Sequence, residues 1–286
     1  MIKLGNLKLK NRIFLAPMHQ VNDIAFRILC KKAGAGLTYT GLINPQTREK
    51  IYLEDKPAIQ FACNSTKNIT EFIKKHDKKI ALYDFNLGCP SPHAKSSKIG
   101  YFMRKDLEKI EPILKIIKEN TKKPITLKIR KMPLNETTAI VNLAEKYCDA
   151  IGIHPRTQEQ GYAGTPDIEF ARQVKKLTKL PIIYSGNINN KEQAESLLQE
   201  FDFIMVGRAA MGNPSIFYEL NSKKTKLISF RDWLKTSKKY KPYFNQIKFQ
   251  ALNFTRDFEG AGKIRLKISL TKTEEEILNI LNEIKN

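Results

Sequence analysis

Short apolar runs rich in β-forming residues recur along most of this chain, and stretches with helical periodicity lie between them. The eight runs are Ile13–Ala16, Leu37–Thr40, Ala58–Ala62, Ala81–Leu87, Ile125–Ile129, Ala150–His154, Pro181–Ser185 and Phe203–Val206. Strands that alternate with helices pair in parallel through right-handed crossovers, and eight such units suit a closed barrel. The sequence therefore predicts an α/β fold, a (β/α)8 TIM barrel.

The stretches between these runs have the spacing of amphipathic helices. One of them places Ile140, Leu143, Ala144 and Tyr147 at positions i, i+3, i+4 and i+7, which form one helix face. An open doubly wound sheet is the main alternative to a barrel, and it usually shows the motif GxGxxG after its first strand. Here the first run leads into Ala16–His19, which contains no glycine. The barrel is therefore the preferred prediction.

The pattern changes after Tyr218. No further strand-like runs follow, and aromatic residues alternate with lysines, which indicates a small helical domain. We predict a barrel domain at residues 1–220 and a basic helical domain at residues 221–286. From Asn221 to Lys272 there are 14 Lys and Arg against three acids, so this segment alone carries a charge of +11.

The chain as a whole is strongly basic, with 50 Lys and Arg against 29 Asp and Glu, a net charge of +21. Such a surplus on a folded chain suggests a polyanionic partner such as nucleic acid, or an anionic membrane surface. A lysine-rich proteome explains the same surplus equally well. The hydrophobic share of 41% and the modest Gly and Pro counts exclude a disordered or low-complexity chain.

The four cysteines, Cys30, Cys63, Cys89 and Cys148, are scattered without a CxxC pair, so neither a zinc site nor a disulfide framework is expected. The N-terminal segment has charges among its apolar residues and lacks the core of a signal peptide. No apolar run approaches the roughly 18 residues of a membrane span. We therefore expect a cytoplasmic protein with reduced cysteines, no metal and no membrane partner.

Glycine-containing turns follow the last two predicted strands, at Ser185–Asn187 and at Gly207–Arg208. In a barrel, the loops after strands 7 and 8 commonly bind phosphate through backbone N–H groups and a helix N-terminus. Arg208 would add a charged fork to such a site. The alternative is that both turns need glycine only for a left-handed backbone conformation. Because both turns occur at these two strands, we favour phosphate binding.

Polar residues at other strand ends would share the same face of the barrel. Lys128 stands in an apolar frame, where an unpaired ammonium is costly to bury, so it favours an anionic or electron-accepting ligand. With His154 and Gln60 it would form a wall for a planar, electron-rich ligand. Cys89, between Gly88 and Pro90, would act as a nucleophile or proton donor, or would only fill space.

Together these residues resemble the tRNA-dihydrouridine synthases, a family of FMN-dependent (β/α)8 enzymes with a helical C-terminal domain. The similarity runs through nearly the whole chain. The matching segments are Leu15–Met18 with Asp23 and Phe26–Arg27, Gly34–Thr38, Asn86–Pro90, Leu127–Arg130, His154–Thr157 with Gly161, Tyr162 and Gly164, Gly186–Ile188, and Gly207–Pro214.

The resemblance implies a cofactor and an electron donor. FMN would be bound by Pro17, Met18, Gln60, Lys128, His154, Ser185, Gly186, Asn187, Gly207 and Arg208. NADPH, or NADH, would reduce it, and no nicotinamide-binding fingerprint is present in the chain.

The resemblance also implies a substrate, namely specific uridines of tRNA, whose C5=C6 bond is reduced to give 5,6-dihydrouridine. Hydride from the reduced flavin would reach C6 of the uracil ring, while Cys89 protonates C5. Asn86 would hydrogen-bond the flipped base, and Arg156 would contact nearby RNA. The residues of the basic helix implied to bind tRNA are Lys263, Arg265 and Lys267. The protein is expected to be a monomer.

Some positions depart from the family's usual pattern. His19–Gln20 replace the small residues that usually follow Pro-Met, Gly41 stands where Glu is common, and Tyr101–Phe102 follow Gly100 where small residues are usual. Of the usual basic helix, the chain retains only Gly260–Lys263 and Arg265–Lys267.

Two other functions fit the same residues. One is a flavin barrel that acts on a free pyrimidine, as dihydroorotate and dihydropyrimidine dehydrogenases do, although such an enzyme would not need a basic helical extension. The other is a non-catalytic RNA-binding barrel. In the preferred interpretation, the segment from about Asn221 onward carries much of the RNA affinity and the barrel alone retains the flavin.

Overall fold

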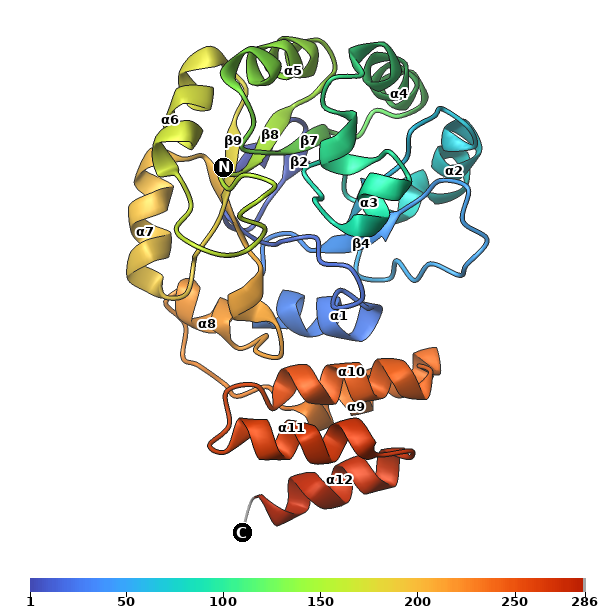
Figure 1. Ribbon diagram of the computed structural model, residues 1–286, viewed down its shortest axis with the longest axis vertical. Coiled ribbons are helices and arrows are strands. Elements are labelled where there is room, and N and C mark those ends of the chain that lie inside the picture. Colours follow the sequence, from blue (N-terminus) through green and yellow to red (C-terminus); the bar gives the residue numbers. More distant parts are fainter. Residues whose placement is uncertain (285–286) are drawn as a thin grey trace.

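Eight parallel strands form one sheet in the computed structural model, which describes residues 1–284. Their spatial order is β3-β10-β9-β8-β7-β6-β5-β4. They are β3 (Ile13–Leu15), β4 (Tyr39–Ile43), β5 (Ala58–Phe61), β6 (Tyr83–Leu87), β7 (Ile125–Arg130), β8 (Ala150–His154), β9 (Ile182–Ser185) and β10 (Phe203–Val206). The first and last strands of this order meet through a parallel bridge between Phe14 and Leu37. The sheet is therefore a nearly closed barrel, which confirms the predicted (β/α)8 fold (Figure 1).

Helices cover the outside of the barrel (Figure 1). They are α1 (Ile24–Ala33), α2 (Ile69–His76), α4 (Leu107–Asn120), α5 (Leu134–Tyr147), α6 (Ile168–Leu177), α7 (Lys191–Glu200) and α8 (Ile216–Leu220). The short helix α3 (Pro92–Ser96) belongs to the loop after β6, where its Ala94 packs against Ala62 and Ile99. Single 3-10 turns occur at η1 (Asp77–Lys79), η2 (Gly100–Met103), η3 (Arg208–Ala210) and η4 (Lys238–Tyr240). Helix α5 buries Ile140, Leu143 and Ala144, as its periodicity predicts. Within residues 1–284, none of the helices has both the length and the apolar character needed to cross a bilayer.

Strand β4 differs from its prediction. The sequence predicts a strand at Leu37–Thr40, whereas β4 spans Tyr39–Ile43. Its pairing with β5 shifts register between Tyr39 and Leu42, and this irregularity keeps the chain in the sheet through Gly41. A bulge of this kind depends on the partner strand, so the apolar pattern of one segment does not reveal it.

Apolar residues close the amino-terminal end of the barrel. Strands β1 (Lys3–Leu4) and β2 (Leu7–Lys8) form an antiparallel hairpin, and Leu4 is buried in one cluster with Phe14 and Phe203. The rings of Phe14 and Phe203 stack with their centroids 5.1 Å apart. Because this end is filled with apolar side chains, polar chemistry is left to the carboxyl ends of the strands.

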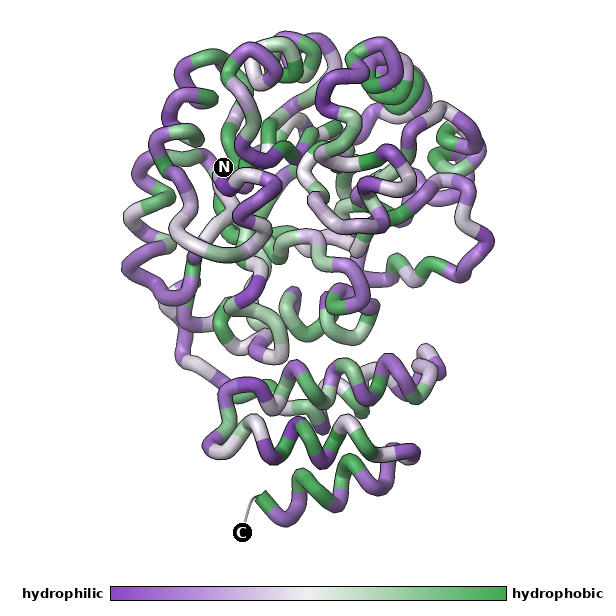
Figure 2. Tube along the Cα trace, in the orientation of Figure 1, coloured by the Kyte–Doolittle hydropathy of each residue, from purple (hydrophilic) through white to green (hydrophobic). Residues whose placement is uncertain are grey.

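Four helices follow the barrel, α9 (Phe230–Ser237), α10 (Phe244–Phe254), α11 (Ala261–Leu270) and α12 (Glu274–Glu283). They stack below α1 and α8 in Figure 1, and Figure 2 shows apolar and polar residues alternating along them. One apolar cluster runs from α1 and α8 into these helices and includes the fully buried Trp233. The predicted boundary at 220/221 falls at the end of α8. That the two parts are independent domains stays a prediction.

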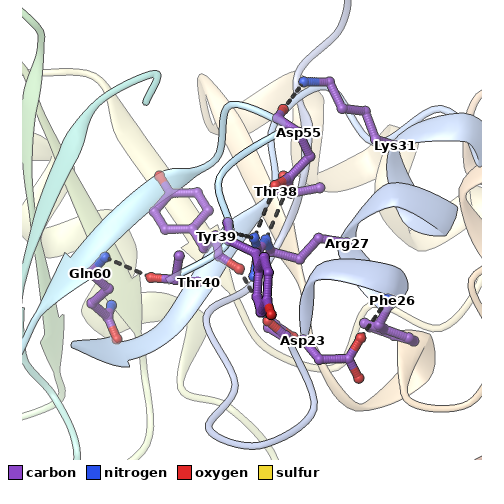
Figure 3. A network of polar contacts seen from close by, with 11 residues as sticks. Asp23, Phe26, Arg27, Lys31, Thr38, Tyr39, Thr40, Asp55 and Gln60 are labelled. Atoms are coloured by element: carbon purple, nitrogen blue, oxygen red, sulfur yellow. Dashed lines mark hydrogen bonds and ion pairs between the residues drawn. The ribbon is translucent and has the colours of Figure 1, made fainter. Parts of the chain in front are cut away.

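A buried ion pair connects α1 to the loop after β4 (Figure 3). Arg27 donates from Nε and Nη2 to the two carboxylate oxygens of Asp55, at 3.0 and 2.9 Å. Thr38 donates to the same carboxylate, and Arg27 Nη1 donates to the carbonyl oxygen of Asn22 at 2.8 Å. A bidentate pair with these further bonds satisfies both charges, so it fixes the chain on either side of α1.

Candidate active site

A cavity of about 700 Å³ lies at the carboxyl ends of the barrel strands. Its lining includes all ten residues assigned to FMN on the basis of the family resemblance, together with Asn86 and Cys89. These residues come from seven strands or the loops after them, so the closed sheet brings together positions that lie up to 191 residues apart, from Pro17 to Arg208. A cavity with convergent polar groups at this end of a barrel is the expected place for an active site.

The loops after β9 and β10 are cross-linked by arginines. The side-chain oxygen of Asn187 accepts from Arg156 Nη2 at 2.8 Å and from Arg208 Nη2 at 2.9 Å. Arg208 Nη1 also donates to the carbonyl oxygen of Tyr162 at 2.8 Å. These bonds hold three loops in one arrangement.

The same loops present backbone amides to the cavity. Among residues 1–284, the N–H groups of Asn187, Ile188, Gly207 and Arg208 donate to no other residue. Unpaired backbone donors in a concave loop are suited to an anion such as a phosphate.

The two glycines of these turns, Gly186 and Gly207, are not there to allow a left-handed backbone conformation. Asn187 is the residue with a left-handed backbone, with φ of 48°, whereas Gly207 has φ of −108° and Gly186 is not left-handed either. Gly186 instead packs tightly on a neighbouring loop, because a Cβ there would lie 3.0 Å from Pro166 Cγ. Close packing, rather than a positive φ, explains this glycine.

Lys128 and His154 form a wall of the cavity, and both have strongly shifted pKa values. Burial lowers the pKa of Lys128 to about 8, and the nearby Asp84 opposes this shift only in part. Burial, and then the positive charges of Lys128 and Arg130, lower the pKa of His154 to about 2, so its imidazole is neutral. Its Nε2 atom is buried and has no hydrogen-bond partner among the described residues. Lys128 and the unpartnered His154 Nε2 are therefore available to hydrogen-bond a ligand.

A chain of hydrogen bonds inside the barrel fixes the amides next to this wall. The fully buried Asp84 accepts from Thr126 Oγ1 and Gln60 Nε2, each at 2.5 Å. Gln60 Oε1 in turn accepts from Asn86 Nδ2 at 2.8 Å. Burial raises the pKa of Asp84 to about 6, although its two hydrogen-bond donors act to lower it. The orientation of both amides is thus set from the barrel interior.

The same chain of bonds reaches the loop that carries Cys89. Asn86 Oδ1 accepts from the amides of Gly88 and Cys89, at 3.1 and 2.9 Å. Gly100, with φ of 61°, packs against this loop so closely that a Cβ there would lie 2.9 Å from the carbonyl oxygen of Cys89. The Cys89 side chain is part-buried and lines the cavity. The loop therefore presents a thiol to the cavity in a fixed position.

The other three cysteines are buried, in line with the packing role expected for them. Burial raises the pKa of Cys63 to about 12 and raises that of Cys30 and Cys148. None of these three lines the cavity.

Arg156 lies beneath the cavity wall and is only 1% exposed. Its Nε donates to the carbonyl oxygen of Ala163 at 2.9 Å, and its Nη2 donates to that of Gly164 at 2.6 Å. The guanidinium thus supports the loop at residues 157–164 and the Asn187 turn. The predicted contact of Arg156 with RNA stays a prediction, and burial of this side chain argues for a supporting role.

Sequence reasoning missed Asp84 and assigned no role to Arg130. Asp84 lies two residues before Asn86 on β6, so both side chains point to the barrel interior, and this alternation could have identified it. Arg130 lines the cavity and donates to the carbonyl oxygens of Gly88, Thr157 and Gly161, at 3.0, 2.9 and 2.7 Å. It therefore connects the Cys89 loop to the loop at 157–164.

Gly41 lies against the loop after β3. A Cβ at this position would come within 3.3 Å of the Cα of His19 and 3.4 Å of the carbonyl oxygen of Met18. His19 itself is exposed and lines the cavity. Two of the departures from the family pattern, at His19 and at Gly41, are therefore neighbours in space.

The three basic residues predicted to bind tRNA lie on α11 and do not line the cavity. Lys263, Arg265 and Lys267 are all exposed, and Lys267 pairs with Glu283 at 3.4 Å. Within residues 1–284, no group of His, Cys, Asp and Glu side chains could hold a metal ion.

The molecule is a parallel eight-stranded barrel with polar groups gathered at the carboxyl ends of its strands. This is the architecture of a TIM-barrel enzyme. The sequence profile of the dihydrouridine synthase family matches residues 14–282, and the chain belongs to that family.

Named relatives agree with this assignment. A probable tRNA-dihydrouridine synthase of Rickettsia conorii is 32% identical over 241 residues, which cover 77% of this chain and 72% of the relative. The tRNA-dihydrouridine synthase B of Xanthomonas axonopodis pv. citri is 29% identical over 238 residues, 77% of this chain and 71% of the relative.

Two solved structures share the fold at low sequence identity. A morphinone reductase variant in complex with tetrahydroNAD has a TM-score of 0.52 at 13% identity, covering 80% of this chain and 92% of that one. The histamine dehydrogenase of Rhizobium sp. 4-9 has a TM-score of 0.55 at 12% identity, covering 89% of this chain and 50% of that one. These likenesses support the barrel fold.

Proposed function

We propose that this protein reduces the C5=C6 bond of uridine in tRNA to give 5,6-dihydrouridine, with FMN as its cofactor and NADPH, or NADH, as the electron donor. Family membership supports the reaction, and the names of the relatives support tRNA as the substrate. The observation that carries the proposal is the meeting of Cys89, Lys128 and His154 in one cavity.

The residues of the cavity fit a flavin mononucleotide. The unpartnered Nε2 of His154 and the ammonium of Lys128 are suited to the polar atoms of an electron-accepting ring. The amides of Asn187, Ile188, Gly207 and Arg208 are suited to its phosphate. Ser185 and Gln60 complete the polar lining, while Pro17 and Met18 supply apolar contact. When bound, the reduced flavin supplies the hydride that uracil accepts at C6.

The protein's own part in the reaction is to hold the base and to deliver a proton. Asn86 has one N–H engaged by Gln60, so its second N–H is available to the base. The Cys89 thiol would donate its proton to C5, the carbon next to the one that receives hydride. Arg130 and the Asn86 amide keep the Cys89 loop in place during this transfer.

The test is to incubate unmodified tRNA with the protein, FMN and NADPH, and to locate dihydrouridine by mass spectrometry. Dihydrouridine at defined positions supports the proposal. Reduction of free uracil or turnover of dihydroorotate, with tRNA unchanged, would instead identify a free-pyrimidine enzyme. A colourless protein that binds tRNA but cannot be reconstituted with FMN would identify an RNA-binding barrel. The cytoplasmic location and the monomeric state remain predictions.

A further inference from the structure

Helix α10 of the helical domain is bound to the loop after β3, which carries two of the predicted FMN residues, Pro17 and Met18. The side-chain amide of Gln246 donates to the carbonyl oxygen of Gln20 at 3.0 Å. The side-chain amide of Gln250 donates to the carbonyl oxygen of Val21 at 2.9 Å. Two glutamines of one helix thus bond the backbone of a cavity-forming loop.

The carboxylate of Asp23 completes this attachment. It caps α1 by accepting from the amide of Phe26 at 2.9 Å (Figure 3). It also accepts from three side chains of the helical domain: Trp233 Nε1 at 3.1 Å, Gln246 Nε2 at 2.9 Å and Gln250 Nε2 at 2.6 Å. A part-buried carboxylate with this number of donors is held firmly, because each lost bond would weaken the compensation of its charge.

The other end of α10 reaches the neighbouring wall of the cavity, at the loop after β10, whose strand pairs with β3. Gly212, with φ of 71°, packs directly on the end of the helix, and a Cβ there would lie 2.1 Å from the carbonyl oxygen of Asn253. Just beyond the helix, Arg256 Nη1 donates to the carbonyl oxygen of Arg208 at 3.2 Å. Helix α10 and the residues just after it therefore connect the neighbouring loops after β3 and β10 on one side of the cavity.

Arg256 is the residue of the helical domain that lines the cavity. Its side chain is 39% exposed, and it pairs with one acid within residues 1–284, Asp257, at 3.8 Å and 78% exposed. On the cavity side it stands with Arg208 and with the unpaired amides of Gly207 and Arg208. A guanidinium beside unpaired amide donors forms a local surplus of positive charge, which suits a phosphate dianion.

We propose that Arg256 binds the phosphate of the flavin mononucleotide, so that the helical domain supplies part of the cofactor site. This inference rests on the proposed function. It differs from the sequence-based expectation that the barrel alone retains the flavin. Under this inference, the helical domain serves the cofactor as well as the RNA.

The experiment compares FMN with riboflavin, which lacks the phosphate, in binding to the full-length protein freed of flavin. Binding is measured by the quenching of flavin fluorescence. For the variant Arg256→Met, we expect the affinity for FMN to fall about tenfold or more and the affinity for riboflavin to stay unchanged. Arg256→Lys should recover part of the loss. Arg231→Met is the matched control, because Arg231 is an exposed arginine of the same domain that does not line the cavity, and it should alter neither affinity.

Two results would overturn the inference. Equal losses for FMN and riboflavin would mean that Arg256 only supports the Arg208 loop. Unchanged FMN affinity, with weaker tRNA binding, would assign Arg256 to an RNA phosphate. Formation of dihydrouridine by the unmutated protein is measured separately. A failure of the proposed function is therefore seen in the parent protein, and a failure of this inference in the variant. Thermal melting of each variant shows that it is folded.

Discussion

Positive charge is arranged in two contrasting ways in this molecule. Around the cavity, Arg130 and Arg208 are fixed by hydrogen bonds to carbonyl and amide oxygens, and Lys128 is largely buried. On α11, Lys263 and Arg265 project into solvent, and Lys267 meets only an exposed acid. Charges that hydrogen bonds hold in place around a cavity orient one bound group, whereas free exposed charges attract a polyanion over a distance and are screened by salt. The same residue types thus serve positioning in one region and attraction in the other.

The largest expected effect is on turnover, from a change inside the cavity. Cys89→Ala should lower the rate of dihydrouridine formation by about 10² to 10⁴-fold, the usual contribution of a general acid. FMN and tRNA affinities should stay the same, because the thiol carries no charge-pairing role in the site. Single-turnover assays measure the rate, and Cys63→Ala serves as a control at a buried cysteine outside the cavity. An unchanged rate in Cys89→Ala would return this residue to a packing role.

The second effect is on RNA affinity, from the exposed region. Reversal of charge at Lys263, Arg265 and Lys267 should weaken tRNA binding at least about tenfold at low salt, and lower the salt slope by about one for each lost phosphate contact. The yellow colour of the protein should persist. Gel shifts across a salt series measure both quantities. Lys263 and Lys267 share a helix face, so reversing this pair should have more effect than reversing Arg265. Equal affinities and slopes would mean that the barrel binds RNA without α11.

A smaller effect, on FMN affinity, is expected when the hydrogen-bonded cation Arg208 is removed. Arg208→Ala removes the bonds to Tyr162 and Asn187, so FMN affinity should fall about tenfold. Fluorescence titration measures it, with Arg48→Ala as an exposed control outside the cavity. Retention of full FMN affinity would place the phosphate elsewhere.

The smallest effect is on stability, and its sign follows from the lowered pKa of Lys128. The folded protein holds this group at a pKa of about 8, below the ordinary value of 10.5, so the charged ammonium costs stability at pH 7. Lys128→Met should therefore raise the free energy of unfolding by about 1–2 kcal/mol at pH 7, since the side chain is partly open to the cavity.

The pH dependence sharpens this prediction. The gain should shrink as the pH rises from about 8 toward 10.5, because the parent loses its buried charge in that range. Urea unfolding at pH 7 and pH 9.5 tests this, with the exposed Lys118→Met as the control. A destabilised Lys128→Met at pH 7 would show that the ammonium is better paired than the structure indicates.

The barrel and most of the cavity could be predicted because they depend on local pattern and on one topological rule. Apolar runs mark the strands, and the rule that carboxyl ends converge brings Gln60, Lys128 and His154 into one cavity. The continuation of β4 to Ile43 could not be predicted in this way, because its irregular pairing depends on β5.

Other parts of the site depend on contacts between distant segments. Arg256 follows the last strand by 50 residues, and nothing in its neighbours indicates that it returns to the cavity. Arg156 was expected to contact RNA, and sequence alone did not reveal that its buried guanidinium binds the carbonyl oxygens of Ala163 and Gly164. Gly186 was read as a turn residue, whereas its contact with Pro166 explains it. Such positions require the packed structure.

The attachment of Asp23 has a consequence for how the chain is made. Its donor Trp233 lies 210 residues later, and β3 likewise waits for β10. At a synthesis rate of roughly 5–20 residues per second, the ribosome adds Trp233 about 10 to 40 seconds after Asp23. During that time the buried face of α1 has no cover from α9 and the barrel has no closed edge. A nascent chain halted before α9 would therefore leave the apolar face of α1 exposed to chaperones and proteases.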